Sequence, residues 1–308
     1  MDLSIICVNW NSLDYLRECI ASVYEQTRGV SFEIIVVDNA SPDEDVDCLL
    51  EHFPQIITIK SRNNLGFAGA NNLGFMRSCG SYVLFLNPDT KLVGPAISTM
   101  LESIAALPDS GIVGGKLLNS DLSVSTSSIQ RYPTILNQIL NVEILRRRWP
   151  GCPLWDLSPL FSESLQPVRV EVIPGACMLL RRKVFSEAGM FSEDYFMYAE
   201  DLDLNYKVKT LGLANYYIGR AEIIHHGGKS SSRQRVSQWA TKMKYRAMSL
   251  LFRKMHGRTY GAMYRLAMGA TAAGRLIVLA MIFPFGKRES VRSASGKWSA
   301  VMKWALGL

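Results

Sequence analysis

Residues 82–90 read Tyr-Val-Leu-Phe-Leu-Asn-Pro-Asp-Thr, an apolar run that ends in a turn sequence carrying a carboxylate. Five apolar residues without polar alternation predict a strand buried on both faces. Three similar runs precede it at residues 3–8, 33–37 and 56–59, and helical patterns lie between the runs at residues 14–26, 45–52 and 69–78. Because strands and helices alternate, we predict an α/β fold with a mainly parallel, doubly wound sheet.

The second half of the chain is less regular. Residues 119–165 are rich in Ser, Pro, Arg and Trp, and we expect a long, partly helical excursion there. Strand patterns return at residues 168–173 and 177–181, and helical patterns follow at residues 199–211, 237–254 and 262–282. A chain of 308 residues has room for one large domain and an appendage. We place the α/β domain at residues 1–232 and a helical, basic extension at residues 233–308.

Charge is distributed unevenly along the chain. Residues 223–308 hold 16 Lys or Arg and one acid, Glu289, whereas residues 1–222 hold 18 bases and 26 acids. A balance of +15 against −8 predicts that the basic end meets an anionic surface, which is either nucleic acid or anionic lipid.

The basic end also contains a long apolar stretch, which favours lipid over nucleic acid. Leu266–Gly286 has about the length of the ~20 residues that a membrane span needs. Arg275 lies near its middle, and the uninterrupted part, Leu276–Phe285, is too short to cross. We expect a peripheral helix at an anionic membrane surface, with Trp298 and Trp304 in the headgroup region. The alternative is a buried helix packed on the α/β domain.

Cysteine usage points to a reducing compartment. The chain contains no CxxC and no zinc spacing among Cys7, Cys19, Cys48, Cys79, Cys152 and Cys177. A strand-like run begins directly after Met1 and Asp2, without the pattern of a signal peptide. We therefore expect reduced thiols and a cytoplasmic protein.

Two carboxylates follow predicted strands and should border one crevice. Ligands of parallel α/β sheets bind outside the carboxyl ends of the strands, where Asp38 and Asp89 lie. Asp38 could accept hydrogen bonds from a base or a ribose, and Asp89 could hold a divalent cation as a hard oxygen ligand. For both residues the alternative is a simple turn.

A Gly- and Asn-rich segment at residues 63–72 opens a predicted helix. Its backbone amides could approach a nucleotide, although a plain loop and helix cap is an equal alternative. The chain has neither GxGxxG nor GxxxxGK[ST] here, which disfavours dinucleotide-binding and P-loop proteins.

The helix predicted from residue 199 carries a candidate general base. Asp201 shares one face with Leu204, Val208 and Leu211, so we expect its carboxylate to point inward with a raised pKa. The alternative is a favourable charge at a helix start. Asp203 and Lys207 should form an outward pair four residues apart.

Two adjacent histidines follow the apolar run at residues 221–224. The segment His225-His226-Gly227-Gly228-Lys229-Ser230 offers an imidazole as a possible ligand for manganese, and a surface loop is the alternative.

Taken in order, seven segments resemble the inverting family 2 glycosyltransferases with a GT-A fold, in particular their rhamnosyltransferase-like members. The resemblance covers residues 3–232 through VNWN, VVDNAS, NNLGFAGANN, YVLFLNPDT, IPGACMLLRRKVFSEAGMF, FMYAEDLDL and HHGGKSS. It implies a nucleotide-binding sheet, a divalent cation (Mn²⁺ or Mg²⁺) and a nucleotide-diphosphate sugar as donor.

The resemblance also implies individual roles. Asp201 is the catalytic base, with Glu200 beside it, and Asp89 and His225 are the metal ligands. The residues expected to border the nucleotide or the donor sugar are Val8, Asn9, Asp38, Asn64, Gly69, Asn72, Asn87, Gly175 and Ala176.

The chain departs from the family pattern at three places. Asn87 replaces the first acid of the DXD-type motif, so one carboxylate anchors the metal. Phe191-Ser192-Glu193 replaces the usual FDE, and Lys207 and Lys209 stand where arginines are common.

We therefore expect an inverting transfer of a single sugar, with L-rhamnose from dTDP-rhamnose as the first donor to test. The expected acceptor is a polyprenyl-linked glycan of bacterial cell-surface polysaccharide synthesis, used at the inner face of the cell membrane. A processive synthase is disfavoured because no QxxRW segment occurs. The alternatives are an inactive sugar-nucleotide-binding scaffold protein and a transferase of the same fold that uses a different donor, such as a UDP-sugar.

Overall fold

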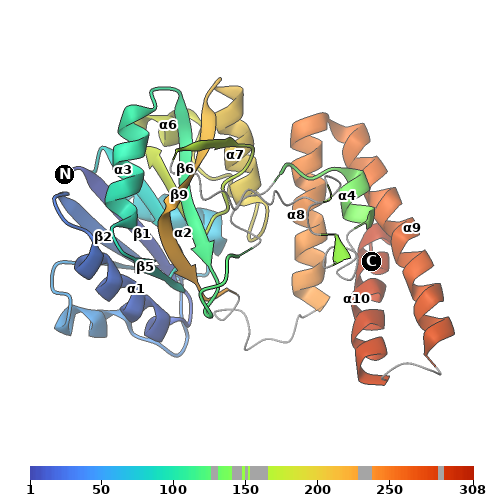
Figure 1. Ribbon diagram of the computed structural model, residues 1–308. Helices are drawn as coiled ribbons and strands as arrows, with labels where there is room; N and C mark the ends of the chain where they lie inside the picture. Colours follow the sequence, from blue (N-terminus) through green and yellow to red (C-terminus); the bar gives the residue numbers. More distant parts are fainter. Residues whose placement is uncertain (126–130, 141–147, 150–151, 153–165, 228–237, 284–287) are drawn as a thin grey trace. The chain divides into compact units, whose positions relative to one another are not determined.

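The computed structural model describes the chain except for residues 126–130, 141–147, 150–151, 153–165, 228–237 and 284–287. The chain divides into two compact units, which Figure 1 shows as a sheet-containing part and a helical part. The first unit comprises Met1–Tyr132, Leu157–Phe196 and Glu200–Arg233, and the second comprises Pro133–Asp156, Met197–Ala199 and Gln234–Leu308. Much of the predicted excursion at residues 119–165 lies outside the described residues, as do Gly228, Lys229 and Ser230 of the histidine segment.

A mixed sheet forms the centre of the first unit. Within the described residues its strands are β1 (Leu3–Asn9), β2 (Phe32–Asp38), β3 (Ile57–Lys60), β4 (Tyr82–Leu86), β5 (Thr90–Val93), β6 (Ser110–Leu118), β7 (Val168–Val170), β8 (Cys177–Arg181) and β9 (Ala214–His225). Their order is β3-β2-β1-β4-β8-β6-β9-β5, and β7 pairs with β9. The strands β3, β2, β1 and β4 pair in parallel, as β6 and β9 do, whereas β8 runs antiparallel to both of its neighbours. The predicted α/β class with a mainly parallel sheet is confirmed.

Helices cover both faces of this sheet because successive strand residues point to opposite faces. Ile5 belongs to a core cluster with side chains of α1 (Leu13–Gln26) and α3 (Ala96–Ala106). The next residue, Ile6, belongs to a second cluster with side chains of α2 (Gly66–Arg77), α6 (Arg182–Glu187) and α7 (Glu200–Thr210). The predicted helix at residues 45–52 is instead a 3₁₀ helix, Val46–Glu51, whose cap Asp45 accepts a bond from the backbone N–H of Asp47.

The second unit is helical. It contains α4 (Ile135–Leu140), α8 (Gln238–His256), α9 (Arg258–Ile282) and α10 (Arg288–Leu306), and the three long helices pack on one another. Gly257, with φ of 89°, separates α8 from α9. The unit therefore includes residues 133–156 as well as the C-terminal helices, whereas we expected the extension to begin at residue 233.

Candidate active site

Asn9 organises the carboxyl ends of β1 and β2. It is fully buried, and its side-chain Nδ2 donates bonds of 3.2 Å each to Asp38 Oδ1, Ser41 Oγ and Glu44 Oε2. The structure thus brings Asn9 and Asp38 together as expected, with Asp38 almost fully buried. Val8, the residue before Asn9, packs against an apolar cluster that includes Val37.

Glu44 is a residue of this region that the sequence did not reveal. Its carboxylate accepts bonds of 3.1 and 3.2 Å from the backbone N–H of Leu13, at the start of α1. No local signal marks it, because its partners Asn9 and Leu13 lie more than 30 residues away in the chain.

Asparagine side chains join the end of β2 to the start of α2. Asn39 Oδ1 accepts a bond from Leu65 N at 2.7 Å, and its Nδ2 donates to Asn64 Oδ1 at 3.0 Å. Asn64 Oδ1 also accepts from Gly66 N at 2.9 Å. The backbone N–H groups of Leu65 and Gly66, which we expected to contact a nucleotide, therefore donate to asparagine side chains of the protein.

Gly66 lets the backbone at the start of α2 approach the carbonyl oxygen of Phe196 more closely than a residue with a Cβ atom could. Its φ is +70°, and a Cβ atom here would lie 2.1 Å from the carbonyl oxygen of Phe196. That same carbonyl accepts a bond from Phe67 N at 3.0 Å. The start of α2 is thereby tied to the segment that leads into α7.

Asn72 and Gly69 lie within α2 and contact protein groups. Asn72 exchanges two hydrogen bonds with the backbone of Phe191, at 2.9 and 3.1 Å, and donates a third to Glu193 Oε1 at 3.0 Å. Because Asn72 is also buried, its amide could contact a donor only after these bonds break. A Cβ atom at Gly69 would lie 3.1 Å from the Cβ of Leu65.

Asp89 and His225 lie together at the ends of β4 and β9. Asp89 Oδ1 is 3.3 Å from His225 Nε2, and Asn87 Nδ2 is 3.5 Å from the same nitrogen. Two backbone contacts fix this arrangement. Thr90 pairs with His225 in the sheet, and His226 N donates a 2.9 Å bond to Asp89 O.

This pair of side chains fits one octahedral cation. Neighbouring ligands about 2.1 Å from such an ion are about 3 Å apart, close to the observed separation of 3.3 Å. Among the described residues no group of three or more His, Cys, Asp or Glu is suited to a metal, so further ligands would come from the donor or from water.

Asp201 and Glu200 lie side by side at the start of α7, where Glu200 is buried and Asp201 is half-buried. Asp201 Oδ2 accepts a bond from Gly175 N at 3.0 Å, and Oδ1 accepts one from Leu202 N at 2.8 Å. Burial raises the pKa of Asp201, in the expected direction, while these backbone N–H groups oppose the shift. Burial, and then the charge of Asp201, raise the pKa of Glu200 to about 8. Near neutral pH the raised pKa therefore favours the protonated form of Glu200.

The backbone just before this pair is strained. Tyr198 and Ala199 both have positive φ, 72° and 65°, although neither is glycine. Such conformations cost of order 1–3 kcal/mol each and gather at functional sites.

The segment before β8 connects the two carboxylate sites. Ala176 O accepts a 3.0 Å bond from Asn87 N, next to the metal-ligand candidates, while the adjacent Gly175 N donates to Asp201. A Cβ atom at Gly175 would lie 3.5 Å from Asp201 Oδ2. The predicted residues Asn87, Gly175, Ala176 and Asp201 therefore form one continuous hydrogen-bonded edge.

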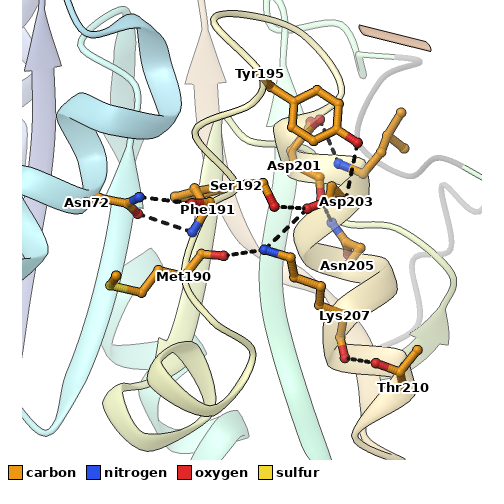
Figure 2. A network of polar contacts seen from close by, with 11 residues as sticks. Asn72, Met190, Phe191, Ser192, Tyr195, Asp201, Asp203, Asn205, Lys207 and Thr210 are labelled. Carbon is orange, nitrogen blue, oxygen red and sulfur yellow. Dashed lines mark hydrogen bonds and ion pairs between the residues drawn. The ribbon is translucent and has the colours of Figure 1, made fainter. Parts of the chain in front are cut away.

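Helix α7 is held by polar contacts that the sequence did not reveal (Figure 2). Asp203 Oδ2 accepts a 2.6 Å bond from Ser192 Oγ and lies 3.3 Å from Lys207 Nζ, and Lys207 also donates to Met190 O at 2.8 Å. The expected pair of Asp203 and Lys207 therefore forms, but its predicted outward position is wrong, because Asp203 is only 2% exposed. Leu211, expected on the inner face, is 43% exposed because α7 ends at Thr210.

Asn205 fixes the position of Asp201. Its Nδ2 donates to Asp201 O at 2.7 Å and to Ile173 O at 2.8 Å, and its Oδ1 accepts from Ile173 N at 2.9 Å. Asn215 Nδ2 donates to the same Oδ1 at 2.9 Å. Fully paired buried amides of this kind make the local geometry rigid.

The arrangement suits proton removal from a hydroxyl near an anionic leaving group. A half-buried carboxylate with a raised pKa can act as a general base, and a carboxylate and an imidazole can share a cation that faces a diphosphate.

Comparisons with known proteins agree with this chemistry. The profile of Glycosyl transferase family 2 matches residues 4–189. The chain is 29% identical, over 256 residues, to the N-acetylglucosaminyl-diphospho-decaprenol L-rhamnosyltransferase of Mycobacterium tuberculosis, covering 79% of this chain and 81% of the relative.

Two solved structures share the fold. GalNAc-T7 with UDP, GalNAc and Mn²⁺ matches with a TM-score of 0.58 and 14% identity, over 73% of this chain and 43% of that one. The mannosyltransferase PcManGT from Pyrobaculum calidifontis, in complex with GDP-Man and Mn²⁺, matches with a TM-score of 0.57 and 15% identity, over 99% of this chain and 86% of that one.

Proposed function

Because the chain belongs to glycosyl transferase family 2 and is a glycosyltransferase, we propose that it transfers one L-rhamnose from dTDP-rhamnose to a lipid-linked glycan acceptor with inversion of the anomeric centre. The rhamnosyltransferase of Mycobacterium tuberculosis, whose name specifies a decaprenol-linked acceptor, supports this choice of donor and acceptor class. The product would enter bacterial cell-surface polysaccharide synthesis.

The observation that carries the proposal is the hydrogen-bonded edge from Asn87 through Ala176 and Gly175 to Asp201. It holds the candidate base and the candidate metal ligands on either side of one short backbone segment. A glycosyl transfer needs this separation of tasks, since the attacking hydroxyl loses a proton on one side of the sugar while the diphosphate leaves on the other.

Asp201 would accept the proton of the acceptor hydroxyl as that oxygen forms its bond to the anomeric carbon. The bond from the anomeric carbon to the phosphate oxygen breaks in the same step, and both of its electrons leave with the nucleoside diphosphate. Glu200, protonated near neutral pH, adds no second negative charge beside the base.

Asp89 and His225 would hold Mn²⁺ or Mg²⁺, which when bound neutralises charge on the diphosphate. The solved complexes of GalNAc-T7 and PcManGT contain Mn²⁺, which supports a divalent ion in this fold. Asn87 supplies an amide where a second carboxylate is usual, so we expect weaker retention of the cation than in a site with two acids.

We also propose that the protein works at the inner face of the cell membrane, as a peripheral protein. A polyprenyl-linked acceptor is confined to the bilayer, and residues 234–308 contain 14 Lys or Arg and one acid. Near an anionic leaflet each such cation adds about 1 kcal/mol of attraction.

A donor screen tests the proposed reaction. Thermal shifts of the full chain would be measured with dTDP-rhamnose, UDP-sugars and GDP-mannose, each with Mn²⁺, Mg²⁺ or EDTA. We expect the largest stabilisation from dTDP-rhamnose with a cation, and turnover with a lipid-linked N-acetylglucosaminyl diphosphate.

Other outcomes would contradict the proposal at distinguishable points. A larger shift and turnover with a UDP-sugar would replace the donor. Binding without turnover for any donor and acceptor would favour a sugar-nucleotide-binding scaffold. Retention of the anomeric configuration, measured by NMR of the product, would overturn the role of Asp201.

A further inference from the structure

Helix α9 is apolar on two sides, and one side is packed within the second unit. The buried residues Gly261, Tyr264, Met268 and Ala272 follow one another at helical spacing. Tyr264 contacts the ring of Phe252 on α8, with centroids 4.8 Å apart, and that of Trp304 on α10, at 6.0 Å. This side of α9 is the core of the helical unit.

The other side of α9 carries exposed apolar residues and is here called the outer face. It consists of Leu266, Ala270, Gly274, Ile277, Val278 and Met281, all exposed. Leu266 is 75% exposed and Met281 68%, and the helix between them extends about 24 Å at 1.5 Å per residue. Among Leu266–Phe283 the sole charged residue is Arg275.

Arg275 does not interrupt the outer face, contrary to what its position in the sequence led us to expect. Its Nη2 donates to Ile139 O on α4 at 2.9 Å, and its guanidinium lies 4.3 Å from the ring centroid of Trp298 on α10. Trp298 is 7% exposed, so the expected place of this ring among lipid headgroups is wrong. Both residues belong to the interior contacts of the helical unit.

The exposure of α9 distinguishes it from the core helix that we considered as the alternative. By length and composition α9 is able to cross a membrane, with a mean hydropathy of 1.5 over its most apolar 18 residues. A core helix of this composition would be mostly buried, whereas 11% of that window is buried here.

The basic residues around α9 indicate that the surface it meets is negatively charged. Exposed arginines occur near its start, at Arg258 and Arg265, and on α10 at Arg288 and Arg292. Helices α8 and α10, which pack along α9, also carry exposed cations, such as Arg253 and Lys303. A spanning orientation of α9 would take these cations into hydrocarbon, whereas an orientation parallel to the bilayer leaves them at the headgroups.

We propose that the outer face of α9 lies in the interface of an anionic lipid bilayer, parallel to its plane. The physical contact needs only the second unit, and its purpose, to meet a lipid-linked acceptor, rests on the proposed function. A bound face of this kind buries its apolar side chains about 5–10 Å deep among headgroups and upper acyl chains.

Flotation of the full chain with vesicles tests this surface. The vesicles would be phosphatidylcholine alone, or phosphatidylcholine with 30% phosphatidylglycerol. The variant Ile277→Ser/Met281→Ser is compared with the control Met76→Ser/Leu122→Ser, which removes equally exposed apolar side chains from the first unit.

We expect the wild-type chain to float with the anionic vesicles and to be released by salt. The outer-face variant should partition at least ~10-fold more weakly, and the control within about twofold of wild type. Both variants should keep the thermal shift with dTDP-rhamnose and the turnover of a short-chain, water-soluble acceptor, which separates this proposal from that of the reaction.

Equal flotation of the wild type and the outer-face variant would overturn the proposal, as would failure of the wild type to bind anionic vesicles. A wild-type dimer that Ile277→Ser/Met281→Ser converts to monomer, seen by light scattering without lipid, would assign the outer face to a second copy of the chain instead.

Discussion

Replacing Asp201 by Asn removes the proposed base with little change of shape. The two carboxylate oxygens accept bonds from two different backbone donors, Gly175 N at 3.0 Å and Leu202 N at 2.8 Å. An amide has one oxygen, so its NH₂ group must face one of these N–H donors, which costs about 1–3 kcal/mol. Removing a charge next to Glu200 offsets part of this cost, because the charge of Asp201 disfavours ionisation of Glu200. We therefore expect Asp201→Asn to fold.

The catalytic effect should be much larger than the effect on stability. A positioned general base contributes about 10²–10⁴-fold, which corresponds to about 3–5 kcal/mol at 1.36 kcal/mol per tenfold. An amide cannot accept the acceptor proton, so kcat should fall by about this factor. Donor affinity should change by no more than about threefold, because Asp201 is not among the candidate nucleotide contacts.

Single-turnover transfer and calorimetric titration with dTDP-rhamnose measure the two effects separately. Glu200→Gln is the matched control, since Gln resembles the protonated acid that the raised pKa predicts, and it should keep kcat within about tenfold at pH 7. A variant Asp201→Asn that retains more than a tenth of wild-type kcat would show that another group removes the proton.

Four variants test the metal ligands, the buried acid and the polar support of α7. Asp89→Ala should abolish cation-stimulated transfer and His225→Ala should raise the Mn²⁺ concentration for half-maximal rate, as followed by metal titration after EDTA treatment; full activity of the wild type in EDTA would contradict both. The pKa of Glu200 is about 8 in the folded protein against 4.5 for an ordinary Glu, so the folded state binds this proton more tightly than the unfolded state. The free energy of unfolding of the wild type should therefore fall as pH rises from 4.5 to 8, by up to about 1.4 kcal/mol per pH unit. Glu200→Gln should remove that slope in urea denaturation at pH 5 and 8, and equal slopes would refute the assignment. Asn205→Ala removes four buried hydrogen bonds and should lower the free energy of unfolding by about 3–5 kcal/mol, against about 0.5 kcal/mol for the exposed control Asn63→Ala. Similar losses in these two variants would mean that the Asn205 contacts do not stabilise α7.

Strands β1, β2 and β4 were predictable because a strand that is buried on both faces consists mainly of apolar residues. The apolar runs of β1, β2 and β4 are continuous, and their carboxyl ends place Asp38 and Asp89 at one edge by geometry alone. Strands β6 and β5 carry no such signal. Strand β6 contains adjacent glycines, Gly114 and Gly115, at close contacts with neighbouring strands and loops, and β5 has only four residues.

The periodicity of apolar residues could not predict the burial of polar residues whose partners are distant in the sequence. Asp203 and Asn205 look like surface positions of a helix, yet they are buried because Ser192 and Asn215 satisfy them. The predicted surroundings of Arg275 and Trp298 were wrong for the same reason, because each contacts the other from a different helix, 23 positions away in the sequence.

The place of β8 in the sheet has a consequence for synthesis of the chain. Strand β4 ends at Leu86, but β8, which pairs with its second edge, begins at Cys177. At about 5–20 residues per second, a ribosome needs about 5–20 s to add the residues between them. During that time an apolar strand edge is open to pairing with other chains. We expect nascent chains that end before residue 177 to need a chaperone, and the carboxylates of the candidate active site to meet only after this edge has closed.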